Sequence, residues 1–309
     1  MDEERQPLTP EFASHLLLGA GFDVAPDEIR VEQRDERSVA FMPGKRILWY
    51  PASEVGRQRL NIEGRTLKLL EQRCSFAAPR IIFESDAGWQ IRTMVAGVVD
   101  PWGMLKLTQE NLAFASDIGR AMGLVLAEQH TQVLSGDVDG WLPTRPAWPE
   151  PRDWIEQRLP WVIDDLALLH DIHATMDACE ALVIDKSDCV LVHGDLGLHN
   201  IVVDPTTKKL RGVFDYDGSA WADRNLDFRY FIFDEMDDEP LEAGIAAYES
   251  KTGLRLDRRR IRIYNAFCAI SFLAYRDGIA PERIWCGRTL EGDLKWTRGA
   301  ITRAQQAGM

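Results

Sequence analysis

Polar side chains separate two short apolar runs in the segment Val192-His193-Gly194-Asp195-Leu196-Gly197-Leu198-His199-Asn200-Ile201-Val202-Val203. Short apolar runs bounded by turn residues are typical of buried strands, so Val190–His193 and Ile201–Val203 are predicted to be strands. Asp195 and Asn200 then lie on the loop that joins them. A carboxylate and an amide five residues apart are thus held between two fixed elements.

A second carboxylate stands at the end of the next predicted strand. Leu210–Phe214 is apolar and leads directly into Asp215. One carboxylate can orient a hydroxyl and accept its proton, while further oxygen ligands hold magnesium beside phosphate groups. The residue types and their spacing therefore indicate phosphoryl transfer. The alternative is that Asp195 and Asn200 only form the turn, as Asp and Asn often do.

The pattern His-Gly-Asp-x-x-x-x-Asn, followed by an apolar strand ending in Asp and an aromatic residue, resembles the aminoglycoside phosphotransferase family. That group includes choline, homoserine and macrolide kinases. The resemblance continues into Ala222-Asp223-Arg224-Asn225-Leu226-Asp227, which is similar to the family's Gly-Asp-Pro-x-x-Asp-Leu stretch. It implies an α+β, protein-kinase-like fold with a small β-rich N-lobe, which carries one key helix, and a larger, mainly helical C-lobe.

The resemblance also implies a role for each matching residue. Asp195 would be the catalytic base, Asn200 and Asp215 would bind magnesium, and Asp227 would brace the catalytic loop by accepting its backbone N–H groups. Asp217 is either a second metal contact or an exposed turn residue.

Two histidines of the loop can be interpreted in two ways each. In the family, the histidine at the position of His193 packs and hydrogen-bonds beneath the loop, and we favour that role over a catalytic one. His199 either points toward the acceptor or is solvated, and the solvated position is favoured.

Periodicity predicts the order of the other elements. In the first part of the chain, a helix starting at Thr9-Pro10 is followed by three strands, predicted at Ile29–Gln33, Arg37–Met42 and Lys45–Tyr50. A helix at Ser53–Glu71 comes next, and two strands at Arg80–Glu84 and Trp89–Met94 follow it. A long helix from Thr108 to His130 follows, with helices resuming near Trp154 and Trp161 and three more near 241–252, 257–276 and 290–306. We expect an N-lobe at 1–97 and a C-lobe at 98–309.

The N-lobe departs from the family at one position. The family has a lysine or arginine on the third strand, which contacts the nucleotide phosphates and pairs with a helix glutamate. Trp49 occupies that place here, although Glu63 matches the glutamate. We expect Glu63 to lie at the nucleotide site and, without that cation, to turn away, to bind another basic residue or to take part in metal or water contacts. Lys45 and Arg46 are not easy replacements for the missing cation, whereas Arg57 and Arg59 could supply charge from another direction. The predicted hairpin around Arg34-Asp35-Glu36 has no glycine, so nothing in it resembles a glycine-rich phosphate loop.

The family places the adenine base at the hinge after the last N-lobe strand. That hinge falls at Met94, Val95 and Ala96, where backbone groups would bind the base of ATP or GTP.

Bulk composition narrows the class of protein. The formal charge of −13 disfavours nucleic acid and anionic membranes as partners. No apolar run approaches the roughly 18 residues of a membrane span, and no apolar signal core follows the charged N-terminus. Five cysteines, an odd number without CxxC spacing, argue against a disulfide framework or zinc site. A cytoplasmic enzyme is expected.

These features together predict a magnesium-dependent kinase that moves the γ-phosphate of ATP or GTP to a hydroxyl of a small molecule. An aminoglycoside, choline, homoserine or macrolide type of acceptor is implied by the resemblance. An amine-bearing acceptor could meet the acidic run Asp234, Glu235, Asp237, Asp238 and Glu239, unless that run is a solvated loop. The ten tryptophans could instead line a sugar or aromatic pocket. Two alternatives are a nucleotide-binding pseudokinase, suggested by Trp49, and another phosphate-handling enzyme of this fold.

Overall fold

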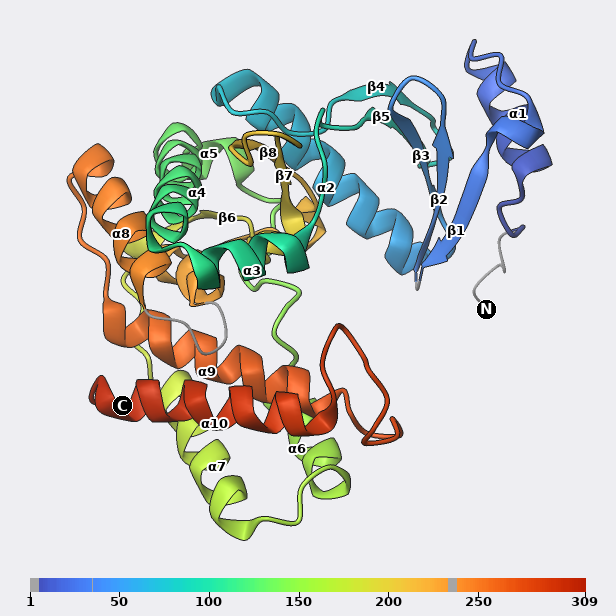
Figure 1. Ribbon diagram of the computed structural model, residues 1–309. Coiled ribbons are helices and arrows are strands. Elements are labelled where there is room, and N and C mark those ends of the chain that lie inside the picture. The colour runs from blue at the N-terminus through green and yellow to red at the C-terminus, as the bar shows by residue number, and fades with distance from the viewer. Residues whose placement is uncertain (1–5, 35, 233–237) are drawn as a thin grey trace.

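The computed structural model describes residues 6–34, 36–232 and 238–309, and Figure 1 shows its two parts. One part is built on a small antiparallel sheet and the other is mainly helical. This confirms the expected α+β, kinase-like arrangement. The boundary near residue 97 stays a prediction.

The sheet has the order β1-β2-β3-β5-β4, and every neighbouring pair is antiparallel. Its strands are β1 (Arg30–Arg34), β2 (Arg37–Met42), β3 (Arg46–Pro51), β4 (Ile81–Glu84) and β5 (Gln90–Thr93). The predicted strands all form, with ends shifted by one residue or so. Strand alternation gives this sheet two faces with different partners.

Helix α1 (Pro10–Gly19) covers the outer face of the sheet (Figure 1). It begins where predicted, because the Thr9 side chain accepts the Phe12 N–H and Pro10 occupies the first turn. Its Leu17 packs with Leu48 and Ile91 of the sheet in one buried cluster. The outer face is therefore a hydrophobic core.

Helix α2 (Glu54–Arg73) covers the inner face and lies between the sheet and the helical part (Figure 1). Ser53 caps its N-terminus by accepting the Gly56 N–H. Leu60 packs against Val39 and Trp49 on this face. The inner face of the sheet therefore faces the helical part of the protein, with α2 between them.

The helical part differs from the prediction near its start and in one strand. Instead of one helix there are two, α3 (Pro101–Glu110) and α4 (Leu112–Gln132). They are separated by Asn111, whose side chain caps α4 by accepting the Phe114 N–H. The short strands are β6 (Cys189–Val192), β7 (Ile201–Val203), β8 (Leu210–Val213) and β9 (Ala220–Asp223). Strand β9 was not predicted, and it pairs with β6.

The remaining helices are α5 (Ser135–Val138), α6 (Arg152–Arg158), α7 (Leu166–Glu180), α8 (Glu239–Thr252), α9 (Arg258–Ala274) and α10 (Leu290–Gln306). Among them, α6, α7 and α10 pack against α9, whereas α8 packs mainly against α4. The helix expected near Trp161 begins instead at Leu166, and Trp161 ends a short 3₁₀ turn. Helices α9 and α10 run side by side (Figure 1).

Helices α4 and α8 approach each other at backbone distance. A Cβ at Gly119 would lie 2.1 Å from the Pro240 carbonyl oxygen, and one at Gly123 would lie 2.3 Å from that of Gly244. Larger residues would force the helices apart. This contact fixes α4, and with it His130, beneath the predicted catalytic loop.

The described part of the chain contains no helix that is both long and apolar enough for a membrane span. The five cysteines are all free thiols.

Candidate active site

The loop after β6 brings three predicted residues together. The Asp195 Oδ2 atom accepts hydrogen bonds from Asn200 Nδ2 at 3.0 Å and from His199 Nε2 at 3.1 Å. The Asp195 side chain keeps 32% of its surface exposed, although it stands deep in the protein. His199 is about half exposed, so it is both solvated and in contact with Asp195. The solvated interpretation had missed this contact.

Asp195 is suited to remain ionised at neutral pH. Burial alone would raise the pKa of its carboxyl, but the hydrogen bond and charge of His199 outweigh burial and hold the pKa below its ordinary value. An ionised, partly exposed carboxylate can accept a hydrogen bond from a hydroxyl in the cleft.

Asp227 braces this loop, as expected. Its Oδ2 accepts the backbone N–H of His193 at 2.8 Å and its Oδ1 accepts that of Gly194 at 2.9 Å. His130 Nε2 lies 3.1 Å from Oδ2. Burial would raise the pKa of Asp227, but these donors outweigh it and lower the pKa. The carboxylate therefore fixes two consecutive peptide groups just before Asp195.

His193 has the structural role that we favoured. Its Nδ1 accepts the Asp195 N–H at 3.3 Å, while Nε2 lies 3.0 Å from the Phe214 carbonyl oxygen. Both bonds are satisfied by the neutral tautomer that carries its proton on Nε2. Burial also lowers the His193 pKa, which favours the neutral form.

Gly194 is required where it stands. Its φ is +84°, and a Cβ would lie 2.4 Å from the Gly218 carbonyl oxygen. Any side chain here would push the loop away from the segment that follows Asp215.

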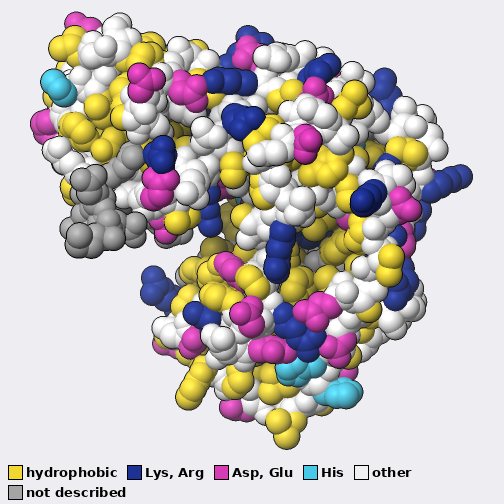
Figure 2. Space-filling model, turned by 180° about the vertical axis from the view of Figure 1, so that it is seen from behind, with side chains coloured by type: hydrophobic (Ala, Val, Ile, Leu, Met, Phe, Trp, Pro, Cys, Tyr) yellow, Lys and Arg dark blue, Asp and Glu magenta, His cyan; other side chains and the backbone are white. Residues whose placement is uncertain are grey.

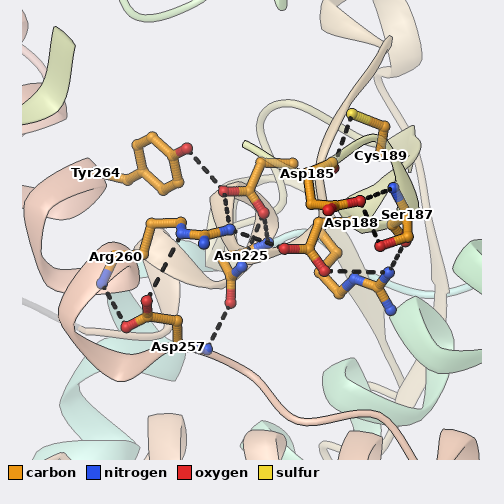
Figure 3. Close-up of polar contacts among 10 residues, drawn as sticks. Asp185, Ser187, Asp188, Cys189, Asn225, Asp257, Arg260 and Tyr264 are labelled. Carbon is orange, nitrogen blue, oxygen red and sulfur yellow. Dashed lines mark hydrogen bonds and ion pairs between the residues drawn. The ribbon is translucent and has the colours of Figure 1, made fainter. Parts of the chain in front are cut away.

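A polar network anchors the segment that carries Asp227 (Figure 3). Asp223, at the end of β9, accepts the N–H of Asn225, the Tyr264 hydroxyl at 2.8 Å and Arg260 at 3.1 Å. Arg260 also bonds Asp188, which precedes β6. In Figure 3 these side chains converge from β9, α9 and the turn before β6. They hold the start of β6 and the end of β9 to α9, at the end of these paired strands that lies away from Asp195.

Asp215 lies beside Asn200, because β7 and β8 pair and the Phe214 N–H donates to the Asn200 carbonyl at 3.1 Å. Its φ of 69° is left-handed, a strained conformation for an aspartate. Burial and the charges of Asp217 and Glu63 raise its pKa well above the ordinary value. Its buried Oδ1 atom has no hydrogen-bond partner in the described part of the chain. A buried oxygen of this kind calls for a ligand.

These residues fit a magnesium ion. Within the described residues, the two side-chain hydrogen bonds of Asn200 both use Nδ2, so Oδ1 is available together with Asp215 Oδ1. Magnesium commonly takes one or two protein oxygens and completes its shell with water and phosphates. No group of three or more His, Cys, Asp or Glu side chains within the described ranges forms a fuller metal cage.

Asp217 is neither exposed nor alone. Its side chain is 23% exposed, and Oδ2 accepts a hydrogen bond from Arg37 Nη2 at 2.6 Å. Since Arg37 begins β2, this ion pair joins the sheet to the segment after Asp215. The prediction of an exposed turn residue was wrong.

Two arginines that the sequence analysis did not consider surround Glu63. Arg92 Nη1 lies 2.7 Å and Arg37 Nη1 3.3 Å from Glu63 Oε2. Although burial would raise its pKa, the charges of Arg92 and Arg37 lower it, so Glu63 is ionised. Of the three outcomes expected for Glu63, pairing with another basic residue is the one that the structure shows.

The four cations considered as replacements bond other groups or lie elsewhere. Arg57 pairs with Glu54 on the surface, and Arg46 donates to the Pro43 carbonyl beside Phe22 on the outer face. Lys45 belongs to the turn before β3, and the Arg59 side chain is exposed. The antiparallel register would have pointed to Arg37 and Arg92, because it puts both on the face of Trp49.

Trp49 lies within this cluster, and its side chain is only 8% exposed. Its ring centroid is 4.7 Å from the guanidinium carbon of Arg37 and 5.6 Å from that of Arg92. An arginine over an aromatic face is attracted to the ring. Trp49 therefore supports the cations that neutralise Glu63.

This geometry changes the expected effect of Trp49→Lys. A lysine would match the cation that the family carries on its third strand, but it would add a third cation to an occupied cluster and remove the ring. We expect no tighter nucleotide binding and a loss of roughly 3–5 kcal/mol in the free energy of unfolding. Urea denaturation measures the loss, with Trp49→Phe as the control that keeps an aromatic face. A Trp49→Lys protein as stable as wild type, with tighter ATP binding, would refute this interpretation.

The predicted hinge follows β5. The Met94 N–H donates to the Lys45 carbonyl at 2.8 Å, and Val98 exchanges two backbone hydrogen bonds with Val203 of β7. Met94 and Ala96 are exposed, and Val95 is half-buried. Between these anchors, the N–H groups of Val95 and Ala96 make no backbone hydrogen bond within the described residues. They stay candidates for binding a nucleotide base.

The predicted acceptor side is only partly described. Asp234, Glu235 and Asp237 lie outside the described residues. Asp238 pairs with Arg262 and Glu239 accepts from Ser116, so these two carboxylates are already engaged.

Half-buried aromatic side chains extend from the loop over α9. The Tyr230 ring lies 5.5 Å from that of His199, and the Tyr230 hydroxyl accepts from the Cys268 thiol at 3.2 Å. Cys268 in turn accepts from the Trp148 indole N–H at 3.0 Å. Trp148 packs on Tyr275 with centroids 5.4 Å apart. Figure 2 shows a hollow on one face of the molecule, with hydrophobic side chains inside and Lys or Arg side chains near it.

The chain resembles several solved structures over nearly its whole length. A GDP complex of a mutant aminoglycoside 2′-phosphotransferase-IIIa shares 13% identity, with 97% of each chain covered and a TM-score of 0.63. Macrolide 2′-phosphotransferase MphH from Brachybacterium faecium shares 19%, with 96% of each chain covered and a TM-score of 0.61. Choline kinase LicA from Streptococcus pneumoniae shares 13%, with 96% and 98% covered and a TM-score of 0.59. These similarities show the fold.

A curated relative matches part of the chain. Streptomycin 3′′-kinase of Streptomyces griseus is 32% identical over 84 residues, which are 26% of this chain and 31% of that protein. The match thus spans about a third of the relative. The model of the phosphotransferase enzyme family covers more, matching residues 45–264, which include Glu63, Asp195, Asn200, Asp215 and Asp227. The chain therefore belongs to the phosphotransferase enzyme family.

Proposed function

We propose that this phosphotransferase is a magnesium-dependent kinase that moves the γ-phosphate of ATP or GTP to a hydroxyl of a small molecule. The observation that carries the proposal is the meeting of Asp195, Asn200 and Asp215 at adjacent strand ends, where the buried Asp215 Oδ1 has no partner in the described residues. Oxygen ligands and a partly exposed carboxylate are the two parts that this chemistry requires.

In this mechanism Asp195 accepts a hydrogen bond from the acceptor hydroxyl and takes its proton as the new O–P bond forms. The bond between the γ-phosphorus and the bridging oxygen of the nucleotide breaks in the same transfer, and the nucleoside diphosphate leaves. His199 and Asn200 hold the carboxylate in place through the hydrogen bonds to Oδ2. Asp227 and the Asp223 network keep the loop rigid, so little reorganisation is needed during transfer. Magnesium, bound by Asn200 and Asp215, would neutralise charge on the phosphates. The hinge at Met94, Val95 and Ala96 would bind the base.

The acceptor belongs to the same proposal. Similar proteins are named for streptomycin, macrolides and choline, and one similar structure is a kanamycin complex. Tyr230, Trp148 and Tyr275 favour an acceptor with a sugar or other ring, because ring faces stack on aromatic side chains. Asp238 and Glu239 give no added support for an amine-bearing acceptor, since both have partners. A cytoplasmic location remains a prediction from composition.

The pseudokinase alternative rested on Trp49. It loses that support, because Arg37 and Arg92 bring positive charge to Glu63 from neighbouring strands. The deciding experiment measures nucleoside diphosphate release from ATP and from GTP with magnesium. The acceptor panel contains streptomycin, kanamycin, a macrolide and choline, and Asp195→Ala gives the background. Turnover above that background supports the kinase. Nucleotide-induced stabilisation with no turnover on any acceptor supports a regulatory protein.

Asp215→Asn should weaken magnesium-dependent nucleotide binding as well as turnover, since an amide replaces the anionic ligand. Loss of an outer-shell partner already costs roughly 10–100-fold in metal affinity, so at least that effect is expected. Calorimetric titration of ATP with magnesium and with EDTA measures it. Asp204→Asn makes the same chemical change in a turn that contributes no candidate metal ligand, and this variant should bind ATP with magnesium as wild type does. An unaltered magnesium dependence would place the metal elsewhere.

A further inference from the structure

The inner face of the sheet carries two arginines that differ in access to the cleft. The side chains of Arg92 and Glu63 are 1% and 3% exposed, whereas that of Arg37 is 12% exposed. Arg92 also donates to the buried Gln90 Oε1 atom at 2.7 Å and 3.1 Å. All of its described hydrogen bonds and ion pairs thus go to buried protein groups. Arg92 neutralises Glu63 and is not available to a ligand.

Arg37 lies between Glu63 and the segment that carries the candidate metal ligand. It bonds Asp217, two residues after Asp215, and is held over the Trp49 ring. Its described polar contacts use one N–H of Nη2 and one of Nη1. A guanidinium has five N–H donors, so Arg37 retains others for an anion. Its charge is also felt at Asp215.

We propose that Arg37 binds the phosphates of the nucleotide, with Glu63 and Trp49 as the residues that position it. This inference rests on the proposed function, since a metal ion at Asp215 would bring the phosphates beside this arginine. The cation that the family carries on its third strand is then supplied here from β2. An arginine can bind phosphate with two parallel N–H bonds, which a lysine cannot.

No other candidate cation combines these properties. Arg46 faces α1 on the opposite side of the sheet, and Arg57 pairs with Glu54 at the surface. Arg59 acts electrostatically on Asp217 but is exposed on α2 and has no described contact with Glu63. Arg37 alone among them touches both Glu63 and Asp217.

The test compares the dissociation constants of ATP, ADP and adenosine, each with magnesium, by calorimetry. Arg37→Met removes the charge and keeps much of the side-chain length. We expect the ATP constant to rise about 10–100-fold, the size of a charge-assisted hydrogen bond to phosphate, and the adenosine constant to change less than about twofold. Arg46→Met, on the outer face, is the matched control and should leave all three constants unchanged. Arg37→Lys keeps the charge but not the two parallel N–H bonds, so it should recover only part of the ATP affinity. If Arg37→Met fails to fold, a folded Arg37→Lys that binds ATP as tightly as wild type would overturn the inference.

The outcomes separate this inference from the proposed function. If wild type binds neither ATP nor GTP, both are wrong. If wild type binds and turns over nucleotide but folded Arg37→Met keeps its ATP constant within about twofold, Arg37 is not the phosphate ligand and the kinase proposal stands. An equal loss of ATP and adenosine binding would also overturn the inference, because it would mean general damage to the N-lobe.

Discussion

Asp195→Ala is expected to lower kcat by about 10²–10⁴, because removal of a general base usually has an effect of that size. The nucleotide dissociation constant should change little, since Asp195 acts on the acceptor hydroxyl. The free energy of unfolding should also stay close to that of wild type, because the side chain is partly exposed. Steady-state kinetics on the acceptor found in the panel, with ATP titrations, measures both quantities.

Two further variants separate the loss of the proton acceptor from the loss of a neighbouring hydrogen bond. Asp195→Asn keeps the shape and can still hydrogen-bond to His199 and Asn200, so its loss of kcat reports the missing proton acceptor. His199→Gln removes a neighbour but leaves the carboxylate and should cost far less. If Asp195→Ala retained more than about a tenth of the wild-type kcat, the base would have to be another residue.

Asp227→Asn is expected to lower the free energy of unfolding by about 3–5 kcal/mol and to reduce kcat strongly. The buried carboxylate accepts two backbone N–H groups and faces His130. An amide has one acceptor oxygen, so a buried donor would lose its partner, and losses of this kind are among the largest for single substitutions. Urea denaturation at neutral pH measures the effect on stability.

Asp204→Asn is the control for that effect. Asp204 also accepts two backbone N–H groups, those of Thr206 and Thr207, and pairs with Arg211, but it lies in a surface turn and keeps 16% of its side chain exposed. Asp204→Asn should lower the free energy of unfolding by no more than about 1 kcal/mol. An equal loss in both variants would show that backbone acceptance alone, without burial, accounts for the stability.

The pH dependence of the Asp227 effect has a definite sign. Since the folded protein lowers the Asp227 pKa, its contribution is complete above the ordinary carboxyl pKa and is lost as pH falls through the lowered value. The stability difference between wild type and Asp227→Asn should therefore narrow below about pH 4. A difference that grew on acidification would contradict the assignment of Asp227 as an ionised acceptor.

The elements that could be predicted are those with a local signal. Thr9 and Pro10 start α1, and alternating apolar residues mark β2. The break at Asn111 was missed, because the polar residues 108–111 are equally typical of the first turn of a helix. Strand β9 was missed since its partner, β6, lies far away in sequence.

The residues of the candidate site also divide into those with a local sequence signal and those that only the fold brings together. Asp195 and Asn200 stand in one motif, and Asp215 follows the next strand, so local pattern and resemblance were enough to bring them together. The cluster around Glu63 could not be found from spacing, because Arg37 and Arg92 come from β2 and β5 and meet only through the sheet register. A basic partner for Glu63 was therefore among the expected outcomes, but the four cations considered did not include the two that bind it.

The cluster of Arg37, Trp49 and Arg92 also bears on how inactive relatives are recognised. A sequence criterion that requires a lysine or arginine on the third strand would classify this chain as an inactive enzyme. In an antiparallel sheet, however, residues of three strands stand side by side on one face, and any of them can bring charge to α2. What evolution has to preserve is then the charge of a surface, and a cation can move between strands if the vacated position becomes a ring that supports it.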